Sequence, residues 1–176
     1  MNMEEKLVNS KTIYDGKVIK VIKDKVICPN GNESFREIIK HNGGAAVLCI
    51  NELEEVLLIK QYRYAYNEIL YEIPAGKLEK DEDPYNAALR ELEEETAFKA
   101  KELIKLGSIY PTCGYSSEII HLFLAKDCKI TKTNFDDDEF IISEFIPLNK
   151  VKDMIKNGII KDAKTICAIS YYELNK

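Results

Sequence analysis

The sequence lacks the segments that insert a protein into a membrane or direct it out of the cell. Its longest uninterrupted aliphatic run covers about six residues, 45–50, whereas a membrane-spanning helix needs about 20. The N-terminus, MNMEEKLVNS, is polar and acidic and has no apolar core for a signal peptide. We therefore expect a cytoplasmic protein with no membrane partner.

Closely spaced cysteine pairs are also missing. The cysteines are odd in number and widely spaced, and the sequence contains no CxxC pair. We expect reduced thiols that serve mostly as small core residues. A catalytic cysteine would need a histidine partner, and only His41 and His121 are available. The cysteines are Cys28, Cys49, Cys113, Cys128 and Cys167.

An excess of basic residues is absent as well, because the formal net charge is −5. Sequence-independent binding to nucleic acid is driven by basic residues that release counterions, so we expect no nucleic-acid partner. A small phosphate-bearing molecule remains compatible with this charge, because bound cations can reverse the local field. With 176 residues, the chain is long enough for one well-cored domain.

An acidic stretch, residues 76–98, stands out from this ordinary background. It reads GKLEKDEDPYNAALRELEEETAF. Asp83 is a good N-cap residue and Pro84 a good first helical residue, so we predict a helix that ends near residue 96 or 97. Its apolar stripe should face the core. The stripe consists of Tyr85, Ala88, Leu89 and Leu92.

Three glutamates share another face of this helix. Glu91, Glu94 and Glu95 stand at positions i, i+3 and i+4, whereas Glu93 points nearly the opposite way. Neighbouring like charges about 5 to 6 Å apart repel by roughly 3 kcal/mol per pair at an effective dielectric constant near 20. A hard divalent cation turns that repulsion into ligation, and ligands that are all oxygen suit Mg²⁺ or Mn²⁺. The alternative is a solvated acidic face, which is typical of charge runs.

The remaining segments predict an α/β fold with a mixed sheet and helices on both faces. In the last helix we expect Ala163, Ile166, Ile169 and Tyr171 to face inward, and we expect Asn149 to cap the helix before it. Strands are predicted at residues 11–27 (a hairpin), 35–40, 45–50, 56–61, 102–110, 119–125 and 140–147, and further helices at 149–157 and 162–174.

The N-terminal segment, residues 1–40, has few large apolar residues for a core of its own. It should therefore pack against the main domain or against a second subunit. We accordingly divide the chain into a β extension, residues 1–40, which we predict to be a dimerisation segment, and a main domain, residues 41–176.

The acidic stretch resembles the signature of the Nudix hydrolases. That signature has a Gly, five residues, a Glu, seven residues, then Arg-Glu, an aliphatic residue, any residue, Glu-Glu, any residue, Gly and an aliphatic residue. The family usually has Gly where this chain has Ala97, a change that costs strain if the backbone there needs a positive φ. The matching residues are Gly76, Glu82, Arg90, Glu91, Leu92, Glu94, Glu95 and Phe98.

The resemblance implies an α/β/α sandwich and a metal-dependent hydrolysis of nucleoside diphosphates linked to another moiety. It assigns Glu91, Glu94, Glu95 and the Ala75 carbonyl to the metal, with Glu94 also counted as catalytic, and it makes Mg²⁺ the expected cofactor, with Mn²⁺ as the alternative. Glu82 and Arg90 are supporting residues, with Arg90 bracing the glutamates. The general base comes from an acidic loop. The candidates there are Glu139, which is preferred for its longer side chain, Asp138 and Asp137.

The flanking segments REIIKHNGGAAV, QYRYAYNEILYEIPAGKLE and YPTCGYSSEIIHLFLA resemble the ADP-ribose pyrophosphatase branch of this family. The branch implies a homodimer and places a proline after the signature near the adenosine; here Pro111 follows Phe98 by 13 residues. Arg36 and Arg63 are expected to grip phosphate, or else to form salt bridges. Glu72 is expected to accept a ribose hydroxyl or a structural hydrogen bond, and Glu118 is a further acidic candidate.

The implied reaction is hydrolysis of ADP-ribose to AMP and ribose 5-phosphate. Two alternatives stay open. One keeps the chemistry and takes another nucleoside diphosphate sugar or NADH as substrate. The other is a catalytically silent sensor that binds ADP-ribose.

Overall fold

The computed structural model describes residues 2–131 and 140–176, and these residues gather into two compact units. The first unit consists of Met1–Gly43 together with Tyr110–Ile119. The second consists of Gly44–Ile109 and Ile120–Lys176. The division at residues 40 and 41 that we expect from the sequence stays a prediction, and the structure adds a distant loop to the N-terminal unit.

The first unit is a three-stranded antiparallel sheet in the order β1-β2-β3. The loop of residues 110–119 joins it through backbone hydrogen bonds, because the Ile39 N–H donates to the Tyr115 carbonyl (2.7 Å) and the Ser117 N–H donates to the Ile39 carbonyl (2.9 Å). Among the described residues of this unit, Val26 is the one apolar side chain that is buried. The strands are β1 (Lys6–Asp15), β2 (Lys20–Ile27) and β3 (Glu33–Lys40).

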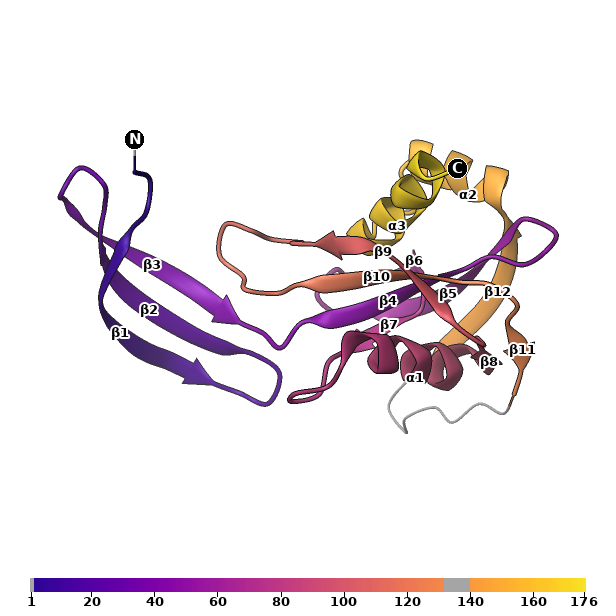
Figure 1. The fold of residues 1–176 in the computed structure, drawn as a ribbon, viewed down its shortest axis with the longest axis horizontal. Coiled ribbons are helices and arrows are strands. Elements are labelled where there is room, and N and C mark those ends of the chain that lie inside the picture. Colours follow the sequence, from indigo (N-terminus) through magenta and orange to yellow (C-terminus); the bar gives the residue numbers. More distant parts are fainter. Residues whose placement is uncertain (1, 132–139) are drawn as a thin grey trace. The chain divides into compact units, whose positions relative to one another are not determined.

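The second unit is built around a mixed sheet in the order β7-β4-β10-β9, in which β4 and β10 run parallel. A three-stranded sheet, β12-β5-β6, and a short pair, β11-β8, complete it. Figure 1 shows these strands between α1 on one side and α2 and α3 on the other. The strands are β4 (Gly44–Cys49), β5 (Glu55–Arg63), β6 (Glu68–Glu72), β7 (Ala75–Lys77), β8 (Phe98–Lys99), β9 (Leu103–Ile109), β10 (Ile120–Ala125), β11 (Lys129–Ile130) and β12 (Ile141–Pro147).

The central strand β4 divides the core into two layers. Successive side chains of a strand point to opposite faces, so Ala46 and Leu48 pack into the cluster that includes α2 and α3. Ala45, Val47 and Cys49 pack into the cluster that includes α1. Both faces are covered, which confirms the predicted sandwich.

The three helices are α1 (Pro84–Thr96), α2 (Leu148–Lys156) and α3 (Ala163–Leu174). Within residues 2–131 and 140–176, no helix has the length and apolar character needed to cross a membrane.

The acidic helix α1 begins where the sequence predicts, with Asp83 as N-cap and Pro84 as the first helical residue.

Two details of the C-terminal helices differ from the sequence prediction. Helix α2 begins at Leu148 after Pro147, with no side-chain cap, so the capping role predicted for Asn149 is wrong. Leu148 is buried, and its N–H donates to the Glu54 carbonyl (2.9 Å), which holds the first turn in place of a cap. In α3, Ala163 is exposed and Lys164 is buried, so the predicted inward face is wrong at its first position.

The end of α1 shows the backbone conformation of Ala97, where the family usually has Gly. Ala97 is the C-cap, with φ 60° and ψ 19°, which is the left-handed region. This conformation costs an L-residue with a Cβ about 1–2 kcal/mol. Glycine has no Cβ and avoids this cost, although it loses more conformational entropy on folding. The backbone at Ala97 thus has the positive φ that makes an alanine strained at this position.

Ala97→Gly is expected to raise the free energy of unfolding by about 0.5–1 kcal/mol, because it removes this strain. Urea unfolding would measure the change. Ala163→Gly is the control, since Ala163 is exposed at the start of α3 and glycine should lower stability there. A lower stability for Ala97→Gly would contradict the argument.

Candidate active site

The acidic face of α1 lies against strand β7. The Glu95 side chain is 3% exposed, and its carboxylate accepts the N–H of Ala75 (2.9 Å). The Glu91 carboxylate lies directly over Gly76, where an added Cβ would stand 1.9 Å from its Cδ. The helix and the strand thus present Ala75, Glu91 and Glu95 at one place.

Arg90 ties the remaining carboxylates to this place. Its Nη1 donates to Glu91 Oε1 (2.8 Å) and to Glu94 Oε2 (2.9 Å), and its Nε donates to Glu82 Oε1 (3.1 Å). Burial alone would lower the pKa of Arg90, but the neighbouring carboxylates raise it above its ordinary range. The hydrogen bond from Arg90 in turn lowers the pKa of Glu82. Arg90 therefore stays charged and braces the glutamates, which is the supporting role expected from the sequence.

The donor chemistry of this place fits a hard divalent cation, because its candidate ligands are all oxygens. The absence of a side chain at Gly76 makes room for the Glu91 carboxylate, which any larger residue would displace. Across residues 2–131 and 140–176, no three His, Cys, Asp or Glu side chains are already grouped to hold a metal ion. Arg90 contacts both Glu91 and Glu94 at present. Metal ligation by Glu91, Glu94, Glu95 and Ala75 stays a prediction.

Gly76→Ala is expected to lower kcat by about 10²-fold, because the new methyl group would push the Glu91 carboxylate out of place and small misplacements cost that much. Stability should change little, since the Glu91 side chain can rotate away. Steady-state kinetics and thermal unfolding would measure the two effects. A wild-type kcat would show that the position of Glu91 over Gly76 is unimportant.

Arg63 and Glu72, two of the predicted substrate contacts, bind each other. Arg63 Nε donates to Glu72 Oε1 and Nη2 donates to Oε2, both at 2.6 Å. Glu72 is 1% exposed, whereas the Arg63 side chain is 38% exposed. The salt bridge allowed for Arg63 and the structural hydrogen bond allowed for Glu72 are thus both present, and contact with substrate stays a prediction.

A buried cation beside Glu72 is a feature that sequence reasoning missed. Lys164 is 9% exposed and pairs with Glu72 and with Asp162, the latter at 2.9 Å. Thr165 donates its hydroxyl to Asp162 (2.6 Å) and accepts the Ile73 N–H (2.8 Å). The start of α3 is therefore fastened to β6 and to the residue after it. Lysine is rarely buried unless it is paired, so the sequence favours an exposed Lys164. No periodic pattern indicates that Glu72 and Asp162 lie close enough to pair with it.

The other predicted substrate residues, Arg36, Pro111 and Glu118, belong to the first unit. Arg36 Nε donates to a carboxylate oxygen of Glu5 (2.9 Å), so its salt-bridge alternative is present. Glu118 Oε1 lies 3.6 Å from His41 Nδ1, and Pro111 is half-buried. The candidate bases Glu139, Asp138 and Asp137 lie outside the described residues.

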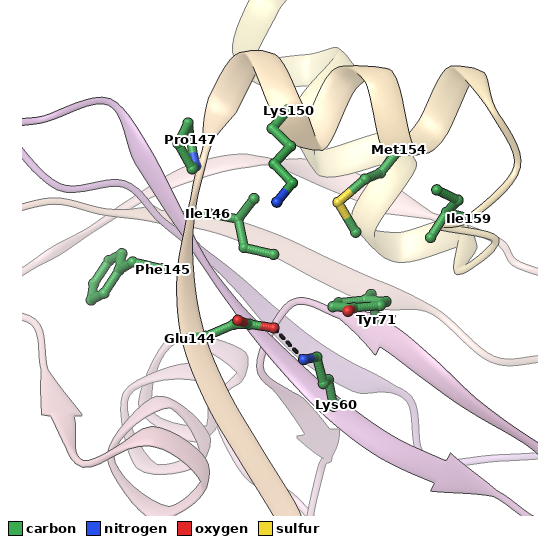
Figure 2. Close-up of a pocket in the computed structure, with 9 residues that line it drawn as sticks. All are labelled: Lys60, Tyr71, Glu144, Phe145, Ile146, Pro147, Lys150, Met154 and Ile159. Carbon is green, nitrogen blue, oxygen red and sulfur yellow. Dashed lines mark ion pairs between the residues drawn. The ribbon is translucent and has the colours of Figure 1, made fainter.

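A separate cavity of about 330 Å³ lies beside α2, between β12, β5 and β6. Figure 2 shows that Lys60 and Glu144 form an ion pair at its edge, and Lys60 also lies 5.0 Å from the centre of the Tyr71 ring. Met154 and Ile159 supply apolar surface. None of the residues predicted for the chemistry lines this cavity, so the predicted site and the cavity are distinct.

The chain matches known proteins over most of its length. The NUDIX domain family matches residues 40–168. An ADP-ribose pyrophosphatase of Bacillus subtilis is 40% identical over 99% of this chain and 96% of its own length. A methanol dehydrogenase activator of Bacillus methanolicus is 40% identical over 98% and 95%. A solved structure, described as an ADP compounds hydrolase, superposes with a TM-score of 0.86 over 99% of this chain and 95% of that one, at 20% identity.

Proposed function

The chain belongs to the NUDIX family of hydrolases, and we propose that it hydrolyses the pyrophosphate bond of ADP-ribose to give AMP and ribose 5-phosphate. The observation that carries the proposal is the set of glutamates on α1 that lies against β7. The B. subtilis relative, which matches nearly the whole chain, bears the name of this activity. The proposal includes a cytoplasmic location.

We propose that the reaction depends on a divalent cation, with Mg²⁺ preferred and Mn²⁺ as the alternative. Glu91, Glu94, Glu95 and the Ala75 carbonyl would hold it. When bound, such a cation neutralises the charge of the pyrophosphate. Arg90 keeps Glu91 and Glu94 in place through its charge-assisted hydrogen bonds.

The remaining roles belong to the chain's own side chains. Glu139 would take the proton from the attacking water, with Asp138 and Asp137 as the alternatives. Arg63 and Arg36 would contact the phosphates, because a guanidinium binds phosphate oxygens in pairs. The other proposed substrate contacts are Pro111, Glu118 and Glu72.

A product analysis tests this function. The purified chain would be incubated with ADP-ribose and Mg²⁺, and ion-exchange chromatography would follow the products. We expect AMP and ribose 5-phosphate in equal amounts, and no turnover in the presence of a chelator. Water labelled with ¹⁸O should deliver one labelled oxygen to one of the two monophosphates.

The alternatives give different results in the same experiment. Faster turnover of GDP-mannose or NADH than of ADP-ribose would move the substrate assignment to another nucleotide and keep the chemistry. Tight binding of ADP-ribose without turnover of any of these compounds would favour the sensor. The intact carboxylate set argues against a sensor, since a pure binder gains nothing from clustered like charges.

A homodimer formed through the first unit is also part of this proposal. Every residue of β1 is exposed, and the strand carries the large apolar residues Leu7, Ile13 and Tyr14. Phe35 on β3 is exposed as well. An apolar surface of this kind on a small sheet is typical of an interface. The subunit mass is 20.2 kDa, so we expect sedimentation to give about twice this value at micromolar concentration.

Ile13→Asp is expected to convert the dimer to monomer, because it buries an unpaired charge in the proposed interface. Ile142→Asp is the matched control, since Ile142 is similarly exposed but lies on β12 of the second unit. Analytical ultracentrifugation would compare the two variants. A wild-type chain that sediments as a monomer would overturn the dimer and leave the proposed hydrolysis untouched.

A further inference from the structure

Two cysteine side chains meet at the edge of the α1 layer. Cys49 is the last residue of β4, and Cys128 lies between β10 and β11, 79 residues away in sequence. Their Sγ atoms are 3.0 Å apart, although both residues are free thiols. A disulfide has its sulfurs about 2.05 Å apart, so an approach of roughly 1 Å would join them.

Strand pairing brings the chain past Cys49 three residues before it reaches Cys128. Strands β4 and β10 run parallel with Cys49 opposite Ala125, and the Ile50 N–H donates to the Ala125 carbonyl (3.3 Å). Cys49 is buried in the core cluster on the α1 side, and Cys128 packs against that cluster. Backbone pairing thus brings the segment that carries Cys128 to the end of β4, and a bond across the 3.0 Å between the sulfurs needs only a small movement.

The two thiols differ in reactivity. The hydrogen bond that Cys49 donates lowers the pKa of Cys128. The same hydrogen bond, together with burial, raises the pKa of Cys49 above its ordinary range. Cys128 is half-buried, whereas Cys49 is 1% exposed. A soluble oxidant therefore reaches Cys128 first, and it meets the thiol that ionises more readily.

We propose that Cys49 and Cys128 form a redox site that closes a reversible intramolecular disulfide when it reduces hydrogen peroxide. The Cys128 thiolate attacks one peroxide oxygen, the O–O bond breaks, and the products are a sulfenic acid on Cys128 and, after protonation, water. The Cys49 sulfur then attacks the Cys128 sulfur, the S–O bond breaks, and its proton leaves with the hydroxide as a second water. Two electrons pass from the sulfurs to one peroxide molecule, and this balances the reaction.

A disulfide between Cys49 and Cys128 would also restrain the strands next to them. Cys128 directly precedes β11, which pairs with β8 immediately after α1. The Thr131 N–H also donates to the carbonyl of Ala97, the C-cap of α1 (2.6 Å). Oxidation would therefore connect the end of β4 to the strand pair that follows α1. Since the bond closes a long loop, we expect it to raise the melting temperature by about 10 °C.

Peptide mapping tests the proposal directly. The full-length chain would be treated with hydrogen peroxide, alkylated without reduction and digested with trypsin. Cleavage after lysine gives one peptide with Cys49, residues 41–60, and one with Cys128, residues 127–129. We expect these two peptides to be joined, with the loss of two hydrogen atoms, and to separate after treatment with dithiothreitol. The five thiols should fall to three in the oxidised protein, and its melting temperature should rise.

Two cysteine-to-serine variants test whether Cys49 and Cys128 react with each other. Cys49→Ser should stop the reaction at a Cys128 sulfenic acid, which dimedone would trap, and should abolish the rise in melting temperature. Cys167→Ser is the matched control, because Cys167 is a half-buried thiol on α3, and it should leave the linked peptide unchanged. A peroxide-treated wild type in which Cys128 is oxidised without the linked peptide would overturn the proposal. All of these readouts are independent of the hydrolase activity.

Discussion

Replacing Glu95 with glutamine is expected to lower kcat for ADP-ribose by about 10³-fold while the fold survives. Glutamine has the size of glutamate, and its amide oxygen can still accept the Ala75 N–H that Glu95 accepts at 2.9 Å. It lacks the charge that a hard cation needs from its ligands. Loss of one preorganised electrostatic contact costs roughly 10²–10³-fold in kcat, and a metal ligand belongs at the upper end of that range.

Glu93→Gln is the matched control for this variant. Glu93 sits on the same helix but pairs with the exposed Lys99 (3.0 Å), so its substitution should leave kcat within about two-fold of wild type. Steady-state assays of both variants at several Mg²⁺ concentrations would separate weakened metal binding from lost chemistry. If Glu95→Gln and Glu93→Gln had the same activity, the metal assignment would be wrong.

Replacing Glu72 with alanine is expected to lower the free energy of unfolding by about 3–5 kcal/mol, the cost of leaving a buried charge without its partner. Glu72 is 1% exposed, and its removal would leave the buried Lys164 with Asp162 alone among the acidic partners seen here. For a chain of this length, the loss corresponds to a melting temperature lower by about 10 °C. Urea and thermal unfolding would measure it.

Glu68→Ala is the control for Glu72, because Glu68 pairs with Lys161 at an exposed position (2.8 Å). Surface ion pairs contribute little, so a change of at most about 1 kcal/mol is expected. Equal destabilisation by the two substitutions would show that the buried network adds nothing. Substrate binding should also be measured, since Arg63 loses its bidentate partner in the Glu72 variant.

Glu72 also makes the stability of the fold depend on pH, and the direction of this dependence can be predicted. Burial alone would raise the pKa of Glu72, but the hydrogen bonds and charges of Arg63 and Lys164 outweigh it and hold the pKa below its ordinary value. A carboxylate of this kind stabilises the fold above its unfolded pKa of about 4.3, and the contribution disappears as pH falls through the lower folded value. Wild type should therefore lose more stability than Glu72→Ala when unfolding is measured at pH 7 and again near pH 3.

The acidic helix could be predicted because its signals are local. Asp83, Pro84 and the apolar stripe fix where α1 begins and which side faces the core. The spacing of the glutamates then determines that Glu91 and Glu95 share a face, and the structure confirms this. Strand β4 was predictable for a similar reason, since an uninterrupted apolar run that is buried on both faces is typical of a central strand.

The features that could not be predicted from the sequence are mostly those that depend on residues far away along the chain. The burial of Lys164 requires Glu72, which is 92 residues away, and this pairing overrides the rule that lysine faces solvent. The very short strands β8 and β11 contain two residues each and have no periodicity to detect. The structural partners of Arg63 and Arg36, Glu72 and Glu5, likewise come from tertiary contacts and not from any motif.

The discontinuous first unit limits how this enzyme can be shortened or recombined. Residues 110–119 depend on Ile39 and His41 for backbone hydrogen bonds, because Tyr115 and Ser117 pair with Ile39 and the Ser117 hydroxyl accepts the His41 N–H (3.1 Å). Removal of residues 1–43 would leave this loop, which carries Pro111 and Glu118, without those partners. A chimera that takes its N-terminal sheet from a relative should therefore take the matching loop as well. The N-terminal sheet and the 110–119 loop thus form one structural unit that should be exchanged as a whole, although two separate segments of the sequence encode it.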